Sequence, residues 1–360
     1  MPFYYTILFI AGVFSLLEIE NLKKKNVLAL YALLCFFLYV LSFIRWETGT
    51  DWGSYYSYFT NSSNLGSDSN YEPLFAFINI FANDLTGDYT FCLFILSSIL
   101  FYFQTKGVYK MSIYPLTSLF MLVGIQFANV NYVRQWVAAM ILFYSVYYIR
   151  QRKLFPYLAL VITACLFHRT SFIFLLAWWV YHLHLSKKTM VILMCVCVAF
   201  SSFISTLFDS IGGLFGEVIQ YKLSVYMDDY DGVEDTGFSP FITILKGVLN
   251  KCVIFFIILF FIDKITEKYP YVRGYFNLYW FGIILYFSLV GVNIIFVRFS
   301  YAYDILLVIL FPYIFSVIKK NSNKIFVWGV LLVYLMMRMY VYLNSYFDLF
   351  VPFKTILEMP

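Results

Sequence analysis

Apolar runs of roughly 15–22 residues recur along the whole chain, and this pattern constrains the fold more than any other feature. A helix of about 20 apolar residues spans the hydrocarbon core of a bilayer. With 62% hydrophobic and 12% charged residues among 360, no polar segment is long enough to form a separate soluble domain. The sequence therefore predicts one polytopic, all-α integral membrane domain, a helical bundle that covers residues 1–360.

Charge placement predicts how the spans cross. Lys23, Lys24 and Lys25 follow the first apolar run rather than precede it, so this run is interpreted as a retained span and not a cleaved signal. The positive-inside tendency then predicts about 12 crossings with both termini outside the cytoplasm. The expected spans are Phe3–Leu17, Val27–Ile44, Thr90–Thr105, Ile113–Ala128, Tyr132–Ile149, Leu154–Phe167, Ser171–Leu185, Thr189–Phe208, Phe241–Ile262, Tyr275–Ile294, Phe299–Val317 and Ile325–Leu343.

The segments between the spans include one short helix and two large loops. Pro73–Leu85 is apolar but short for a crossing, so we predict a re-entrant or interfacial helix there. The two large outer loops are expected at about residues 45–72 and 209–240. The acidic residues of the second loop, Asp228 to Asp235, lack an EF-hand pattern and are expected to be a solvated surface.

Composition also bears on cofactors and partners. All six cysteines lie inside apolar runs, so we expect buried, unpaired thiols rather than disulfides or a metal cluster. We predict no metal and no cofactor. The net charge of +5 is typical of loops that face membrane lipid, so nucleic acid is not an expected partner.

The arginines are distributed differently from the lysines. The predicted topology places most lysines on the cytoplasmic side, where either residue would serve. Bidentate phosphate binding favours the planar guanidinium fork of Arg. The outer side and the outer span ends contain five arginines, which are Arg45, Arg134, Arg169, Arg298 and Arg338.

The first polar constellation lies between Arg45 and Tyr56, directly after an apolar run. Arg45, Glu47 and Asp51 stand there among glycines and aromatic residues. Charged groups next to hydrocarbon usually face a polar cavity, so this stretch is interpreted as one wall of an outer active site. Asp51 is a candidate general base. An Arg45–Asp51 ion pair that fixes the loop to the membrane interface is the structural alternative.

Two further motifs lie at outer span ends. Arg134 and Gln135 open a predicted span, where Arg134 could bind an anion or extend to the headgroups. His168 and Arg169 lie in a tight turn, and an imidazole beside a guanidinium tends to stay neutral, which suits a base. A histidine that merely occupies the turn is the alternative.

Arg298, Tyr301 and Asp304 are spaced by three, so they share roughly one helical face at another outer span end. A buried carboxylate such as Asp304 is expected to be protonated or paired. Either it borders the cavity or it forms a salt bridge that holds the bundle together.

These motifs, taken in order, resemble those of EpsG-like polysaccharide polymerases, which belong with the Wzy-type O-antigen and capsule polymerases. The resemblance extends over most of the chain. It rests on Arg45-x-x-x-Gly49-Thr50-Asp51-x-x-x-Tyr55, Glu72-Pro73-Leu74-Phe75, Arg134-Gln135-x-x-Ala138, Phe167-His168-Arg169-Thr170-Ser171, Arg298 with Tyr303, and Pro312.

The resemblance implies a polymerase of the bacterial inner membrane that joins oligosaccharide repeat units carried on undecaprenyl pyrophosphate, with its active site facing the periplasm. A chain-length regulator and a flippase are the implied protein partners. Such chemistry needs positive charge on the departing pyrophosphate and a base near the acceptor hydroxyl. The expected catalytic residues are Asp51 and His168. The expected pyrophosphate ligands and further cavity residues are Arg45, Arg134, Arg169 and Arg298, then Glu47, Gln135, Tyr301, Asp304 and Arg338.

Two other classes of protein remain as alternatives. A lipid-linked oligosaccharide flippase would also need a basic cavity, but flippases usually show related halves, and none is evident here. A membrane acyltransferase could use His168 as its base, but it would need an acyl-donor path from the cytoplasmic side.

Overall fold

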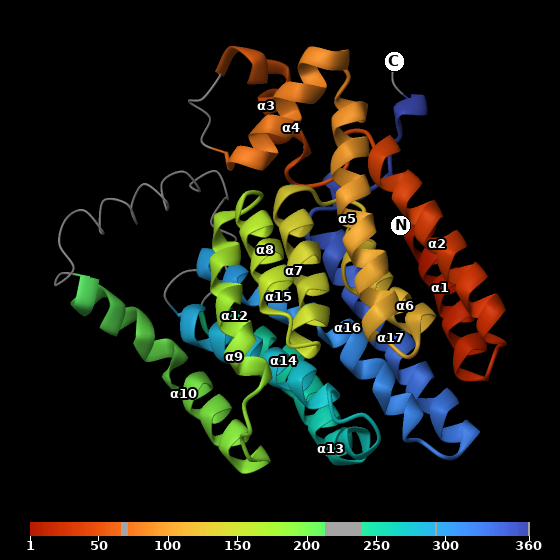
Figure 1. Cartoon of the computed structure of the whole chain (residues 1–360), viewed down its shortest axis with the longest axis vertical. Helices are drawn as coiled ribbons and strands as arrows, with labels where there is room; N and C mark the ends of the chain where they lie inside the picture. The colour runs from red at the N-terminus through yellow and green to blue at the C-terminus, as the bar shows by residue number, and fades with distance from the viewer. Residues whose placement is uncertain (66–70, 213–239, 292–293, 359–360) are drawn as a thin grey trace.

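The computed structural model describes residues 1–65, 71–212, 240–291 and 294–358 (Figure 1). All the regular secondary structure in these ranges is helical, and one isolated antiparallel bridge joins Arg45 to Thr355. The predicted all-α, polytopic membrane architecture is confirmed. The predicted loop at 209–240 lies almost entirely outside the described residues.

Six helical segments of the described chain are long and apolar enough to cross a membrane. Large apolar side chains are exposed on them, for example Phe36, Phe260 and Phe326, as expected for surfaces that contact lipid. The six segments are Pro2–Ile19, Lys24–Ile44, Tyr89–Met111, Thr243–Lys268, Phe296–Ser316 and Asn321–Ser345. The other expected crossings lie in helices outside these six, so the total of about 12 stays a prediction.

The first half of the chain forms antiparallel helices, among which α5 packs on α2 and α7, and α6 packs on α1. Short 3-10 segments continue α6 and precede α9. The elements are α1 (Pro2–Ile19), α2 (Lys24–Ile44), α3 (Trp52–Leu65), α4 (Pro73–Thr86), α5 (Tyr89–Met111), α6 (Pro115–Gln126), η2 (Phe127–Asn129), α7 (Arg134–Arg150), α8 (Leu154–Cys165), η3 (Arg169–Leu176) and α9 (Ala177–Tyr181).

The helices in the second half of the chain are interrupted more often. A π-helical turn, η4, joins α12 to α13, and the apolar segment after α14 alternates between 3-10 and α geometry. The elements are α10 (Lys187–Gly212), α12 (Pro240–Gly247), η4 (Val248–Cys252), α13 (Val253–Lys268), α14 (Val272–Leu289), η5 (Ile294–Ser300), α15 (Tyr301–Asp304), α16 (Leu307–Leu310), η6 (Phe311–Ser316), α17 (Asn321–Ser345), α18 (Phe347–Phe350) and η7 (Ile356–Glu358).

Two helices form a separate cap at one end of the bundle. α4 packs against α3 and α5, and Figure 1 shows α3 and α4 together at the top, beyond the ends of α7 and α8. α4 begins at Pro73 and ends at Gly87, whose φ of 65° is left-handed. This matches the predicted short helix at Pro73–Leu85. Within the predicted loop 45–72, the chain forms α3, because its aromatic side chains pack on α4 and α5.

The connection from α6 to α7 contains unusual backbone geometry. Phe127, Ala128 and Asn129 have φ values of 48°, 50° and 62°, in the left-handed region that L-residues seldom adopt. All three are buried. This turn ends α6 and directs the chain into α7, whose first residue is Arg134.

Candidate functional site

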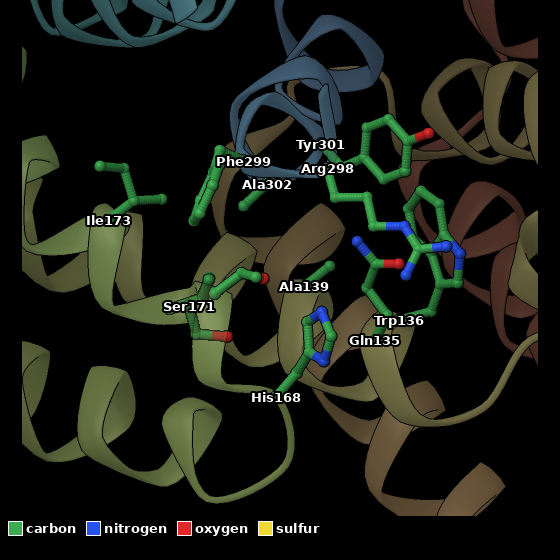
Figure 2. A pocket seen from close by; sticks show the side chains of 12 residues that line it. Gln135, Trp136, Ala139, His168, Ser171, Ile173, Arg298, Phe299, Tyr301 and Ala302 are labelled. Carbon is green, nitrogen blue, oxygen red and sulfur yellow. The ribbon is translucent and has the colours of Figure 1, made fainter. Parts of the chain in front are cut away.

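A small, partly open pocket lies between the start of α7, the start of η3 and the η5–α15 segment (Figure 2). Its volume is about 20 Å³, which is room for roughly one water molecule. A larger ligand therefore needs the surrounding segments to move. The polar and aromatic lining comprises Gln135, Trp136, His168, Thr170, Ser171, Arg298, Phe299 and Tyr301.

Glu72 is the buried carboxylate next to this pocket. It occupies the N-cap of α4 and is 5% exposed. Arg134 Nη1 donates to its Oε2 at 2.9 Å, and the backbone N–H of Arg169 donates to its Oε1 at 3.0 Å. His168 Nδ1 lies 3.4 Å from the same Oε1. One carboxylate thus joins the cap helix to α7 and to the turn before η3.

The surroundings keep Glu72 ionised. Burial alone would raise the pKa of this carboxyl. The neighbouring His168 imidazole, the Arg134 guanidinium and the Arg169 N–H outweigh burial, and together they lower the pKa to about 2. Glu72 therefore carries a negative charge throughout the neutral range.

His168 is held in its neutral form. It is 6% exposed, and burial has the largest effect on its pKa, which it lowers. Glu72 raises the pKa and the charges of Arg134 and Arg298 lower it, and the pKa stays below its ordinary value. Nδ1 faces Glu72, so a neutral ring with its proton on Nδ1 has its lone pair on Nε2. Nε2 makes no hydrogen bond within the described part of the chain. Figure 2 shows the ring directed into the pocket.

Arg298 supplies positive charge to the pocket lining. In Figure 2 its guanidinium, the Gln135 amide and the His168 ring point toward one another. Trp136 and Tyr301 form the adjoining wall, where their rings stack with centroids 5.9 Å apart and planes 13° from parallel. The pocket therefore combines a neutral imidazole, a guanidinium and an aromatic surface.

Arg134 is tightly held beside the pocket rather than in its lining. Besides the Glu72 pair, its guanidinium lies over the ring of Tyr71 at 4.8 Å and within 6.0 Å of the Tyr55 and Phe75 ring centroids. These cation–π contacts and the ion pair fix its orientation. Arg134 is thus suited to fixing Glu72 in place.

Arg45 lies outside the pocket lining and is built into its own loop. It is 1% exposed, and it donates from Nε to the Ser42 carbonyl at 3.1 Å and from Nη1 to the Thr48 carbonyl at 2.6 Å. The same loop is joined to the C-terminal segment, since Trp46 N–H donates to the Lys354 carbonyl. An Arg45–Asp51 ion pair, the structural alternative for this loop, is not among the salt bridges of the described residues.

The remaining predicted residues fall into two groups. Asp51 and Glu47 are exposed on the cap side, outside the pocket lining, and Glu47 pairs with Lys354 at 2.9 Å. Arg169 has an exposed side chain, although its N–H binds Glu72. Asp304 pairs with Lys251, and Arg338 lies within electrostatic range of that lysine.

Glu72 is a site residue that the sequence did not predict. A polar residue directly before a proline that opens a helix is read as a helix-start signal, and that interpretation hid its second role. The available signal was the order of the motifs, because Glu72 stands beside Arg134 and His168 in the resemblance series. The sequence also did not predict three uncharged pocket residues, because the prediction was based mainly on charged side chains. They are Trp136, Thr170 and Ser171, and each lies next to a predicted residue or within two positions of one.

Metal-binding groups of three or more His, Cys, Asp or Glu side chains are not found among the described residues. All six cysteines are free.

Comparison with known proteins gives one match. A family model described as the EpsG family matches residues 28–355 of the 360. This range includes every residue of the pocket, together with Glu72 and its partners Arg134, His168 and Arg169. No curated protein and no solved structure matches the chain.

Proposed function

The chain belongs to the EpsG family, which is a family of Wzy-like polysaccharide polymerases, and on this premise we propose the reaction and the residues that carry it out. The substrates are oligosaccharide repeat units carried on undecaprenyl pyrophosphate. The reaction takes place at the periplasmic face of the bacterial inner membrane, in O-antigen or capsule synthesis. The growing glycan moves from its lipid carrier onto a hydroxyl of the next lipid-linked unit.

The observation that carries this proposal is the Glu72–His168 arrangement with Arg298 beside it. His168 lines the pocket, and its buried Nε2 has no hydrogen-bond partner within the described residues, so once a substrate hydroxyl reaches it a neutral imidazole can accept the proton. Glu72 orients the ring through Nδ1 and stabilises the imidazolium that forms. Arg298 faces the same space, where negative charge would develop on a leaving pyrophosphate.

The anomeric carbon of the growing chain loses its bond to the pyrophosphate oxygen and gains a bond to the acceptor oxygen. The acceptor proton goes to His168 Nε2 and then to water, and the pyrophosphate leaves as an anion on its lipid. Arg298 stabilises that anion. Such electrostatic stabilisation commonly contributes about 10²–10³-fold in rate.

His168 is a better candidate for the base than Asp51. The imidazole lines the pocket, whereas the Asp51 carboxylate is exposed on the cap outside the lining. Arg134 acts as a positioning residue, because its guanidinium is already engaged by Glu72 and Tyr71. Arg45 acts on the fold of its loop, since its donors go to backbone carbonyls.

Substrate entry requires the pocket to widen. A volume of about 20 Å³ holds no sugar or phosphate group. Two of the flanking segments, η3 and η5, are 3-10 helices, whose hydrogen-bond geometry is poorer than that of α-helices. We propose that movement of these segments opens the site to the lipid-linked substrate.

A defined assay tests the proposal. The purified full chain in nanodiscs is given undecaprenyl-pyrophosphate-linked repeat units, and products are separated by size. We expect a ladder of glycans from the wild type, none from His168→Ala and a full ladder from Asp51→Asn. Lipid translocation without a ladder would favour a flippase, and acylated glycan would favour an acyltransferase; either outcome would refute the proposal.

A further inference from the structure

A second group of charges lies inside the bundle, next to the pocket but outside its lining. Lys251 forms an ion pair with Asp304 Oδ2, which also accepts a hydrogen bond from Ser300 Oγ at 2.9 Å. Arg338 lies within electrostatic range of Lys251, Tyr279 and Tyr334. We call Lys251, Asp304 and Arg338 the inner cluster.

Three separate candidate membrane spans each contribute one charge to this cluster. Lys251 lies in the span Thr243–Lys268, Asp304 in Phe296–Ser316 and Arg338 in Asn321–Ser345. Ionisable groups within spans are costly and commonly mark substrate or ion pathways. Lys251 also belongs to the π-helical turn η4, a local distortion that is frequent at functional sites.

The charges of the inner cluster do not cancel. Asp304 neutralises Lys251, and this leaves the positive charge of Arg338. Arg338 forms no ion pair within the described part of the chain, and its Nε is buried without a hydrogen-bond acceptor. A pair that served only to hold helices together would need no third charge. A bound anion would neutralise this excess positive charge.

The inner cluster is close to the pocket. Tyr301 lines the pocket and lies within electrostatic range of both Arg298 and Asp304. Arg298 and Asp304 are held on consecutive turns of the η5–α15 segment. Arg338 is seven residues, or about 10 Å, from Ser345 at the end of α17, so it lies about two turns from that end of the candidate span.

We propose that Arg338 and Lys251 form a second phosphate-binding site, which holds the diphosphate of a second polyprenyl-linked molecule while Arg298 holds the first. This inference rests on the proposed function, because a polymerase must bind two lipid-linked substrates together. The negative charge of Asp304 repels the incoming diphosphate and so weakens its binding. When the diphosphate binds, it replaces Asp304 as the ionic partner of Lys251.

The stoichiometry of lipid binding tests the inference without any glycan chemistry. The full chain is placed in phosphatidylcholine nanodiscs, and bound undecaprenyl diphosphate is counted by native mass spectrometry. We expect two molecules per wild-type chain, one for Arg338→Gln and one for Arg298→Gln. Lys264→Gln changes an exposed cation on α13 and should leave two. Inorganic pyrophosphate at the same concentration should not displace the lipid; if it does, the site takes a soluble anion and the lipid assignment is wrong.

A gain of affinity provides a test that does not depend on losing a cation. Asp304→Asn removes the negative charge that faces the ligand, so undecaprenyl diphosphate should bind roughly tenfold more tightly. Weaker binding by a folded Asp304→Asn chain would overturn the inference. One bound lipid in both the wild type and Arg338→Gln would overturn it while leaving the proposed function intact. No bound lipid in the wild type would refute the proposed function itself.

Discussion

His168 Nδ1 lies 3.4 Å from Glu72 Oε1, although the two residues belong to different helix ends, one before α4 and the other before η3. The contact directs one imidazole nitrogen toward a permanent negative charge and leaves the other for the pocket. Carboxylate and imidazole are thereby arranged as a base and its orienting partner. The contact makes the reactivity of His168 dependent on a residue of the cap.

Replacing Glu72 with Gln should change the pH dependence of polymerisation as well as its rate. Burial and the two nearby guanidinium groups lower the pKa of His168, so its imidazole loses the proton at a lower pH than a free imidazole does. The Glu72 charge opposes this lowering. Its removal should therefore move the acidic limb of the pH–rate profile to lower pH, while the maximal rate falls roughly 10²-fold because the ring loses its orientation. A fall in rate with an unmoved limb would mean that Glu72 acts only on the fold.

The Arg134–Glu72 pair should behave as a coupled unit. Arg134→Met leaves a buried carboxylate without its guanidinium and should destabilise the protein by roughly 3–5 kcal/mol. Adding Glu72→Gln should restore part of that loss, because the unpaired charge disappears. A double-mutant cycle on melting temperatures in nanodiscs measures the coupling; additive effects of the two substitutions would contradict it.

The pair should also have a defined pH window. The pKa of Glu72 is lowered to about 2, so its stabilisation is complete above the ordinary carboxyl pKa of about 4.3 and disappears as the pH falls toward 2. The melting temperature of the wild type should fall more steeply between about pH 5 and pH 3 than that of Glu72→Gln. Parallel curves would show that Glu72 does not contribute this acid sensitivity.

Substitutions of Arg45 and of Arg298 should have different effects, one on folding and the other on polymerisation. Arg45→Ala removes a fully buried donor from two backbone carbonyls and should reduce the amount of folded protein. Arg298→Ala should abolish long glycans in the protein that folds, and Arg298→Lys should restore only part of the polymerisation, since the planar fork is lost. Size-exclusion profiles and glycan ladders from the same preparations separate the two effects. A well-folded, inactive Arg45→Ala would instead place Arg45 in substrate binding.

Two glycines of the same loop provide a matched pair. Gly49 has φ of 118°, and a Cβ there would lie 2.8 Å from the Asn131 carbonyl oxygen and 3.2 Å from Arg45 Nη1. Gly49→Ala should therefore destabilise the loop by a few kcal/mol. Gly53→Ala meets no atom within 4 Å and should be neutral or slightly stabilising, because it begins α3. Similar melting temperatures for the two variants would show that the loop is not under this constraint.

Much of the architecture could be predicted from local sequence. Hydropathy located the long spans, and Pro73 marked the start of α4 to the residue. α3 was expected as a loop because Ser, Asn and Gly dominate its sequence. The structure makes it helical because its aromatic side chains pack on α4 and α5, and such packing overrides weak propensity.

The site was only partly predictable. The structure brings Gln135, His168, Arg298 and Tyr301 into the lining of one pocket. Gln135, His168 and Tyr301 lie at or next to helix starts, whereas Arg298 lies within η5. Arg45 was expected there too, but its donors are taken by carbonyls whose position depends on the tertiary fold. No local pattern reveals that competition, nor that Arg338 lies within electrostatic range of Lys251, which comes from another span.

The loop of Arg45 is completed from the far end of the chain. Trp46 and Gly49 donate to the carbonyls of Lys354 and Leu349, and the Tyr4 hydroxyl donates to the Phe350 carbonyl at 2.6 Å. During translation these acceptors leave the ribosome after nearly every span has been made. The earliest helices must therefore wait in the membrane with this loop open, and a C-terminal truncation before Leu349 would leave it open permanently.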